Sequence, residues 1–413
     1  MRILVSHPTG NEFFREAVNG FYHAGCLHAI YTSVASFPGS LSHRLGSFKK
    51  FSDIRRRTLR AEFKNITHTH PVKEWGRLLA IKAGQKKLVQ HETGIFSADA
   101  AYKSLDKYVA KNLAKEKQKG VTAIYAYEDG AYYTFKKAGA LNLHCVYDLP
   151  IGYWRYMHCL LQQEKEINPD WATTLEGLKD SAEKLERKDE EIALADKIFV
   201  ASSFTMNSLK AYPGTLPPVS IIPYGFPPAH AKSYRTISSS QKIKLLFVGG
   251  LSQRKGLSYL FKAVEGLDAY LELTVVGRLP QTGCEPLHRE LCKHKHISSL
   301  PHKKILGLMQ EQDILIFPSL FEGFGQVITE AMAQGTPVIT TGRTAGPDII
   351  QHGKNGWLVK AGSAEDIKNL LEQIIRHPDL IAETGKQALE TAKQRPWHVY
   401  GEELVKEVLL MDS

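Results

Sequence analysis

Two glutamates, Glu322 and Glu330, stand eight residues apart in the segment PSLFEGFGQVITEAMAQGTPVI. Glu322 follows the apolar run DILIFPS, which is typical of a buried strand, and Glu330 lies within 325–334, where we expect a helix. At about 1.5 Å per residue, eight helical residues span about 12 Å. Carboxylates at that separation can accept hydrogen bonds from hydroxyl groups at opposite ends of one ligand.

Gly323 and Gly325 flank Phe324 between the two glutamates, where the expected helix begins. Glycines let a ligand approach the backbone, and the free N–H groups of a helix start suit a pyrophosphate. A sugar, a pyrophosphate and a ribose in that order make a nucleotide-sugar. The alternative is that Glu322 only favours the helix start electrostatically and Glu330 is a surface residue, which leaves the glycines unexplained.

A second segment, VGGLSQRKG at 248–256, also stands where an expected strand ends and a helix begins. Gly250 allows close approach of a ligand to the backbone, and Arg254 and Lys255 add two cations where a phosphate would lie. The segment does not fit the Walker A pattern G-x-x-x-x-G-K-[ST]. The alternative is a tight turn with two solvated cations.

Apolar runs and amphipathic stretches alternate along the chain, which predicts mostly parallel sheets covered by helices on both faces. One long charged helix is expected at 171–194, and a Pro/Ser/Ala-rich segment at 227–241 indicates a linker. Because the alternation restarts after the linker, we expect an α/β protein with two doubly wound domains facing each other. The expected strands include 2–6, 28–35, 121–127, 143–148, 244–250, 271–277, 313–319 and 336–341, and further strands are expected in ADKIFVASS and VSIIPYGF.

The chain has 413 residues, more than one hydrophobic core normally supports, and is 43% hydrophobic and 23% charged. No apolar run approaches the ~18 residues of a membrane span, and the first residues lack the apolar core of a secretory signal. The five cysteines are scattered without a C-x-x-C pair, which favours a reducing compartment. We therefore expect a cytoplasmic, multi-domain protein.

Cys284, His288 and Cys292 would share one face of a helix and raise the question of a metal. Their spacing matches none of the usual structural zinc patterns, and an ordinary amphipathic helix accounts for them. We expect no metal site.

The formal net charge of the chain is +10. Residues 44–90 alone have a positive excess equal to this value, with 13 basic residues against Asp53, Glu62 and Glu74. Residues 241–413 hold 20 basic and 20 acidic residues. Such asymmetry predicts an anionic partner: a nucleic acid, a membrane surface or an anionic substrate. The alternative is a solvated basic helix that aids solubility. No nucleic-acid-binding motif is present, so we do not expect nucleic acid as the partner.

Taken in order, these segments resemble family four of the retaining glycosyltransferases, the group 1 superfamily with the GT-B fold. EGFGQVITE has that family's E-x7-E pattern, and FVGGLSQRKG is similar to its phosphate-binding F-V-G-R-L-x-x-x-K-G. GTPVITT, HGKNGWLV, ALADKIFVASSF and IIPYGF extend the resemblance over most of the chain. It implies an N-terminal acceptor-side Rossmann-like domain at 1–235 with a basic helical stretch near 44–120. It further implies a nucleotide-sugar-binding Rossmann-like domain at 236–395 and a helix at 396–413 that crosses back to the first domain.

The resemblance also implies which residues bind the donor. Lys255 would contact the diphosphate, Glu330 the ribose hydroxyls and Glu322 the sugar, while Gly10 would approach the diphosphate from the other domain. Gly250 stands where the family often has an arginine, and Arg254 would replace that cation. The whole donor-binding set would be Gly10, Gly250, Arg254, Lys255, Gly323, Phe324, Gly325 and Glu330.

The catalytic histidine that the family often has in its N-terminal domain has no obvious counterpart. CVYDLP offers Tyr147 and Asp148 at the corresponding place, and YEDG offers Glu128 and Asp129. We take Asp148, together with Glu322, as the catalytic candidates.

The resemblance implies transfer of a sugar from a UDP- or GDP-linked nucleotide-diphosphate-sugar to a hydroxyl of a glycan, a lipid-linked or another acceptor, with retention at the anomeric carbon. No nucleophile–base pair of the usual type is visible, so the protein would act by positioning and by stabilising the leaving diphosphate. Asp-x-Asp does not occur in the sequence. We therefore expect activity without a metal or other cofactor, with Arg254, Lys255 and helix N-termini in place of a divalent ion.

Three other functions stay open: a GT-B nucleotide-sugar epimerase or phosphorylase, an inactive nucleotide-sugar-binding subunit, and an anionic-polymer-binding protein. In the leading interpretation the basic excess belongs to the acceptor-side domain. Residues 44–87, with Phe51 and Trp75 interleaved, would then face an anionic acceptor or the cytoplasmic leaflet that carries a lipid-linked one. The expected location is cytoplasmic and peripheral to the inner face of the membrane.

Overall fold

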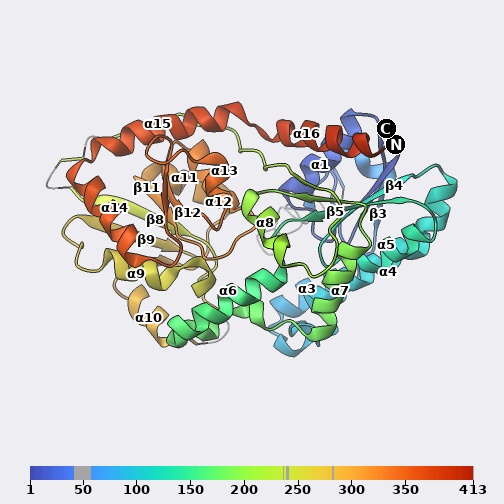
Figure 1. Ribbon diagram of the computed structural model, residues 1–413, viewed down its shortest axis with the longest axis horizontal. Coiled ribbons are helices and arrows are strands. Elements are labelled where there is room, and N and C mark those ends of the chain that lie inside the picture. The colour runs from blue at the N-terminus through green and yellow to red at the C-terminus, as the bar shows by residue number, and fades with distance from the viewer. Residues whose placement is uncertain (41–56, 236, 239–240, 281–282, 413) are drawn as a thin grey trace.

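The computed structural model describes residues 1–40, 57–235, 237–238, 241–280 and 283–412. Two parallel sheets, one of seven strands and one of six, form two neighbouring domains, each with helices on both faces of its sheet (Figure 1). The expected pair of doubly wound α/β domains is confirmed. Residues 41–56, which include Arg44 and Phe51 of the basic stretch, lie outside the described residues.

The N-terminal sheet consists of parallel strands whose central members are apolar runs buried on both faces, as in ILVS at its centre. In sheet order they are β3 (Thr67–Thr69), β2 (Leu27–Thr32), β1 (Ile3–Ser6), β4 (Ala123–Tyr127), β5 (His144–Leu149), β6 (Lys197–Val200) and β7 (Val219–Ile221). The strand order reverses between β1 and β4. The carboxyl ends of these two strands therefore mark the place where such a sheet binds ligands.

The C-terminal sheet repeats this plan. In sheet order its parallel strands are β10 (Lys295–Ile297), β9 (Leu271–Val276), β8 (Ile243–Val248), β11 (Ile314–Phe317), β12 (Val338–Thr341) and β13 (Trp357–Val359). Strands β8 and β11 are neighbours, so the segment after Val248 and the segment after Phe317 emerge side by side. This adjacency brings together the two motifs that the sequence separates by about 65 residues.

The helices follow the alternation of the strands. In the N-terminal domain they are α1 (Glu12–His23), α3 (Val72–Lys82), α4 (Ala98–Gln118), α5 (Tyr132–Gly139), α7 (Ala182–Ala193) and α8 (Ser203–Ser208). In the C-terminal domain they are α9 (Leu257–Val264), α10 (Glu285–Leu291), α11 (His302–Glu311), α12 (Gln326–Ala333), α13 (Gly346–Ile349) and α14 (Ala364–Arg376). Helix α6 (Trp154–Ile167) leads from the N-terminal to the C-terminal domain, α15 (Asp379–Gln394) packs on the C-terminal domain, and α16 (Trp397–Leu409) lies on the N-terminal domain (Figure 1).

The segment after α6 belongs structurally to the C-terminal domain, although it lies within 1–235. Trp171, in a 3-10 helix at Pro169–Thr174, joins the C-terminal core and stacks on Phe261 with ring centroids 6.1 Å apart. The single charged helix expected at 171–194 is therefore wrong. Short 3-10 turns end at Leu178, and α7 begins only at Ala182, after the Ser181 side chain caps it.

Helix α16 returns to the N-terminal domain, where Tyr400 and Leu404 enter its core (Figure 1). It packs on α1 through two glycines: a Cβ at Gly20 would lie 2.6 Å from the carbonyl oxygen of Gly401. The two helices can approach this closely only because neither carries a side chain at the crossing. Small residues at this point therefore fix how the end of the chain attaches to the first domain.

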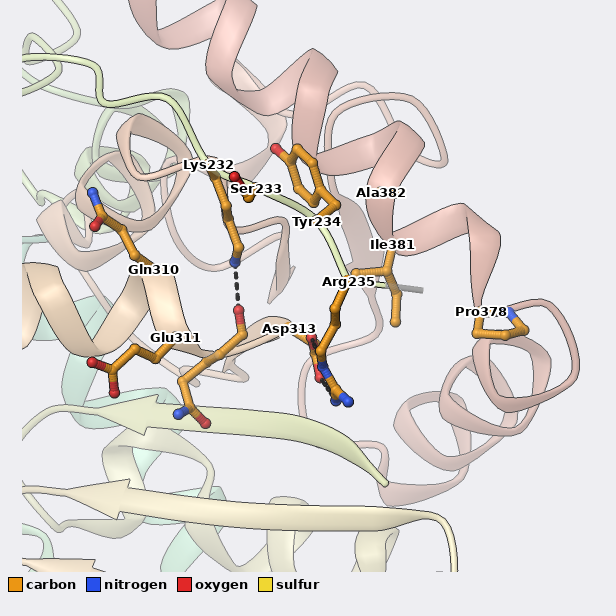
Figure 2. Close-up of a pocket in the computed structure, with 11 residues that line it drawn as sticks. Lys232, Ser233, Tyr234, Arg235, Gln310, Glu311, Asp313, Pro378, Ile381 and Ala382 are labelled. Atoms are coloured by element: carbon orange, nitrogen blue, oxygen red, sulfur yellow. Dashed lines mark hydrogen bonds and ion pairs between the residues drawn. The ribbon is translucent and has the colours of Figure 1, made fainter. Parts of the chain in front are cut away.

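The linker lies on the outside of the C-terminal domain. Figure 2 shows Lys232 and Arg235 lining a small cavity, with Asp313 beside the guanidinium group of Arg235. The cavity has a volume of about 210 Å³. Lys232 Nζ donates to the Gln312 carbonyl at 2.5 Å and to Thr336 Oγ1 at 2.7 Å, and Arg235 pairs with Asp313. These bonds hold the linker in place, so this cavity is part of the scaffold. None of the described helices is long and apolar enough to cross a membrane.

We predict that Gly20→Ala destabilises the protein by about 1–3 kcal/mol, because the new methyl group would overlap the backbone of α16. The measurement is the midpoint of urea unfolding. The matched control is Gly139→Ala in α5, where a Cβ would meet nothing within 4 Å, and which should be neutral or slightly stabilising. Equal midpoints for the two variants would contradict the close crossing.

Candidate active site

A cleft of about 860 Å³ separates the two domains. Its N-terminal wall is formed by the turn between β1 and α1, including Gly10, and by α3. Its C-terminal wall is formed by α11 and α12 and includes Glu330. The structure thus brings Gly10 and Glu330, which are 320 residues apart in the sequence, to one cavity.

Gly10 has a φ of +66°, which a glycine adopts without strain. The turn is held by His7, whose Nδ1 accepts hydrogen bonds from the backbone N–H groups of Thr9 at 3.1 Å and Gly10 at 2.9 Å. Burial, with a contribution from the charge of Arg57, lowers the pKa of His7 to about 3. The imidazole is therefore neutral, as an acceptor of two N–H groups must be.

Glu322 lies at the centre of a second group of side chains, on the loops that follow β8 and β11. Lys255 Nζ contacts its carboxylate directly, and Arg254 Nη1 lies 3.3 Å from the same oxygen. Arg254 Nη1 also donates to the carbonyl of Phe321 at 2.6 Å, which ties the two loops together. The three residues predicted to contact the sugar and the diphosphate are therefore in mutual contact.

This group carries more positive than negative charge. Arg254 and Lys255 are adjacent cations, and Glu322 is the one carboxylate that the described structure pairs with either of them. Burial lowers the pKa of Arg254 to about 10. Burial and the neighbouring Arg254 charge lower the pKa of Lys255, whereas the contact with Glu322 favours its charged form. An anionic ligand here would relieve the repulsion between the two cations.

A cavity of about 370 Å³ opens beside this group and is lined by Gly250, Arg254 and Lys255. Gly250, which stands where the family often has an arginine, is exposed, and a Cβ there would meet nothing within 4 Å. The space that an arginine side chain would fill is therefore open. Arg254 lines the same cavity, as its predicted role requires. Arg278, which follows β9, lines both this cavity and the interdomain cleft, so the two spaces are neighbours.

The loop between Glu322 and α12 packs closely against the N-terminal domain. A Cβ at Gly323 would lie 1.9 Å from the carbonyl oxygen of Pro150, and the Gly323 carbonyl accepts hydrogen bonds from Ser202 at 2.5 Å and Thr205 at 3.0 Å. Phe324 is buried in the N-terminal core cluster. Gly325 is the N-cap directly before α12 and has a φ of +86°. These contacts position the loop backbone, as the sequence suggests, but they also join the domains.

Glu330 lies in α12 on the side that faces the cleft. Its carboxylate accepts from His302 Nε2 at 2.8 Å, at the first residue of α11. The side chain keeps 21% of its surface exposed, so a ligand in the cleft can reach it.

Asp148 is not with the other predicted site residues. It lies in β5, is 3% exposed and accepts a hydrogen bond from the Tyr125 hydroxyl at 2.5 Å. Burial raises its pKa to about 7. The structure therefore places it in the core, because β5 is a central strand with both faces covered.

The other candidates for an N-terminal base are also engaged elsewhere. Glu128 accepts from Lys188 at 2.8 Å, and Asp129 lies 3.4 Å from the same ammonium group. The hydroxyl of Tyr147 donates to Glu191 at 3.0 Å. None of these three lines a described cavity of the active site.

Two residues of the cleft were missed by the sequence analysis. Arg278 directly follows the second strand of the C-terminal domain, and its position at a carboxyl strand end could have marked it. Gln326, the first residue of α12, lines the cleft with a buried amide nitrogen that has no partner among the described residues. Cys284, His288 and Cys292 do not form a metal-ligand group in the described structure.

The arrangement of two parallel-sheet domains around this cleft is the GT-B fold. Sucrose-phosphate synthase of Thermosynechococcus elongatus superposes on the chain with a TM-score of 0.66 at 17% identity, over the full length of both chains. Anabaena HepE, solved in complex with UDP and glucose, gives a TM-score of 0.61 at 17% identity over 99% of each chain. The fold expected from the sequence is thus confirmed.

Residues 232–393, which make up most of the C-terminal domain, match the family model described as "Glycosyl transferases group 1". D-inositol 3-phosphate glycosyltransferase of Corynebacterium jeikeium is 30% identical over 51% of this chain and 57% of the relative. Capsular polysaccharide biosynthesis glycosyltransferase CapM of Staphylococcus aureus is 28% identical over 35% of this chain and 40% of the relative. The matches span between about two fifths and three fifths of these relatives.

We predict that His7 makes the protein acid-sensitive. Its folded pKa of about 3 lies below the unfolded value of 6.5, so the unfolded state binds an extra proton between these pH values and stability falls as the pH drops below 6.5. Relative to His7→Gln, the wild type should lose about 2 kcal/mol more between pH 7 and pH 5. Urea unfolding at both pH values measures this. Parallel losses in the two proteins would show that His7 does not titrate as described.

Proposed function

We propose that the protein is a retaining glycosyltransferase of family four that moves a sugar from a nucleotide-diphosphate-sugar to an acceptor hydroxyl. The observation that carries the proposal is the contact of Arg254 and Lys255 with Glu322 beside a cleft that also holds Gly10 and Glu330. Cations for a diphosphate and carboxylates for two polyols are what such a donor requires. The group 1 relationship of residues 232–393 supports the same conclusion.

Each part of the donor has residues suited to it. Glu330, half-buried beside His302, would accept hydrogen bonds from the ribose hydroxyls, and Arg254 and Lys255 would bind the diphosphate. Glu322 would then exchange its contact with Lys255 for the hydroxyls of the sugar. Gly10 would let the diphosphate approach the first domain, because its turn presents backbone rather than a side chain.

In the proposed step the bond between the anomeric carbon and the diphosphate oxygen breaks, and the acceptor oxygen bonds to that carbon on the same face. The acceptor proton passes to the leaving phosphate oxygen. Asp148 is buried in the core, and Glu12, the carboxylate that the described N-terminal domain presents to the cleft, is paired with Arg15, which favours the phosphate as the destination of this proton. Arg254, Lys255 and the start of α12 would stabilise the charge on the departing diphosphate without a divalent ion.

Solved relatives of the fold favour a uridine donor, since HepE was solved with UDP and with UDP-glucose. Thermal melting in the presence of UDP, GDP and ADP tests both whether the protein binds a nucleoside diphosphate and which nucleobase it prefers. A nucleoside diphosphate at 100-fold its dissociation constant should stabilise the protein by about 2.7 kcal/mol, and EDTA should leave this shift unchanged. If none of the three raises the melting temperature, the proposed function fails. A shift that EDTA abolishes and manganese restores would overturn metal independence.

Lys255→Ala provides the specific test within this experiment. Loss of a charged partner should weaken diphosphate binding about tenfold to a hundredfold. Lys262→Ala is the matched control, because Lys262 is an exposed lysine of α9 in the same domain. Equal weakening by the two variants would show a general charge effect rather than a diphosphate site.

We also propose that the surface around α3 lies on an anionic membrane that carries the acceptor. Val72 and Leu79 are 67% and 56% exposed on α3, and Ile95 nearby in sequence is 56% exposed. Lysines accompany these apolar side chains at positions 73, 82, 86 and 87. Exposed apolar residues among lysines are typical of a surface that rests on acidic lipid head groups.

Co-sedimentation with vesicles tests this surface. The protein should bind phosphatidylcholine vesicles that contain phosphatidylglycerol and bind pure phosphatidylcholine much less, and Val72→Ser with Leu79→Ser should reduce the binding. Tyr270→Ser, at a 50% exposed aromatic residue of the other domain, is the control. Equal binding to both vesicle types would leave only a solvated basic surface.

A further inference from the structure

Arg57 has a polar group for which the described protein provides no partner. Its side chain is 7% exposed and lines the interdomain cleft on the N-terminal wall. Nη2 donates to Glu74, but Nη1 is buried and has no hydrogen-bond partner among the described residues. A buried, unpaired nitrogen of a charged group is costly, so its retention beside a cavity points to a ligand that completes it.

The partner that Arg57 does have is shared. Glu74 is 2% exposed and also accepts two hydrogen bonds from Arg77, at 2.7 Å and 2.6 Å. Burial alone would raise the pKa of Glu74, but the bonds from Arg77 and the charge of Arg57 lower it, so the carboxylate is ionised. One carboxylate divided between two guanidinium groups does not neutralise Arg57.

The surroundings of Arg57 in the cleft are also basic. The cleft lining contains Glu12 and Glu330 as its carboxylates, against Arg15, Arg57, Arg77, Lys82 and Arg278. The field of Arg57 reaches as far as His7, whose pKa it helps to lower. A cleft with this balance attracts anions.

We propose that Arg57, in the part of the cleft that Arg77 and Lys82 also line, binds an anionic group of the sugar acceptor, with the chemistry of a phosphate. This inference rests on the proposed function, because it assigns the N-terminal wall to the acceptor. The donor diphosphate already has Arg254 and Lys255 on the opposite domain, around Glu322. A guanidinium group whose Nη2 is held by Glu74 and whose Nη1 has no partner among the described residues can donate to a phosphate oxygen from a fixed position.

The test is titration of inorganic phosphate, and of glycerol 1-phosphate against glycerol, into protein saturated with the nucleoside diphosphate that stabilises it most. Saturation occupies the donor site, so phosphate binding that remains belongs elsewhere. The wild type should bind both phosphates and not glycerol. Arg57→Gln should weaken phosphate binding about tenfold or more, with less than a twofold change for the nucleotide.

Further variants keep the outcome decisive if Arg57→Gln loses stability by leaving Glu74 with one partner fewer. Arg57→Lys keeps a cation beside Glu74 but lacks the guanidinium fork, and it should also weaken phosphate binding. Arg60→Gln is the matched control, because Arg60 is 43% exposed and pairs with Glu62 outside the cleft.

The remaining outcomes of these titrations contradict either the inference about Arg57 or the proposed function. Phosphate binding that is unchanged in Arg57→Gln and Arg57→Lys overturns the inference. Weakened nucleotide binding with no phosphate binding to the saturated protein assigns Arg57 to the donor and also overturns it. If no nucleoside diphosphate binds, the proposed function fails by itself, and phosphate titration of the nucleotide-free wild type and Arg57→Gln still shows whether Arg57 holds an anion.

Discussion

The site depends on the repulsion between two neighbouring cations, the half-buried Arg254 and the buried Lys255. Both are paired with the same carboxylate, that of Glu322, in the described structure. The fold can hold them there because β8 and β11 are adjacent strands whose carboxyl ends deliver both loops to one place. Burial makes the two charges expensive, and a carboxylate between them lowers that cost only in part. A second anion from outside the protein would lower that cost further.

The two domains are joined by more than the linker. Trp171 anchors the segment after α6 in the C-terminal core, α16 returns to α1, and the loop at Gly323 rests against Pro150. Each of these junctions depends on a close fit, either of a bulky buried ring or of a glycine that packs directly on backbone. The cleft therefore has a shape that is set by packing as well as by the strand order.

Much of the C-terminal site could be predicted because Glu322, Gly325 and Glu330 stand close together in one motif, and local spacing largely decides where they lie. The position of Asp148 could not be predicted from local spacing. An acidic residue at the end of an apolar run can be exposed or buried, and the neighbours that decide this lie elsewhere in the sequence. The expected helix at 171–194 failed because tertiary packing of Trp171 overrode a favourable local pattern. Arg57 could not be distinguished from the other basic residues of its stretch by sequence. What sets it apart is its buried contact with Glu74, which is 17 residues away.

The hydrogen bonds from Ser202 and Thr205 to the Gly323 carbonyl have a consequence for motion. They cross from one domain to the other and end on the backbone between Glu322 and α12. Moving the domains apart would break both bonds, so the position of the loop that follows Glu322 is coupled to the angle between the domains. A ligand that favours the bonded position of this loop must also favour this angle, and by reciprocity this angle must tighten the binding of that ligand.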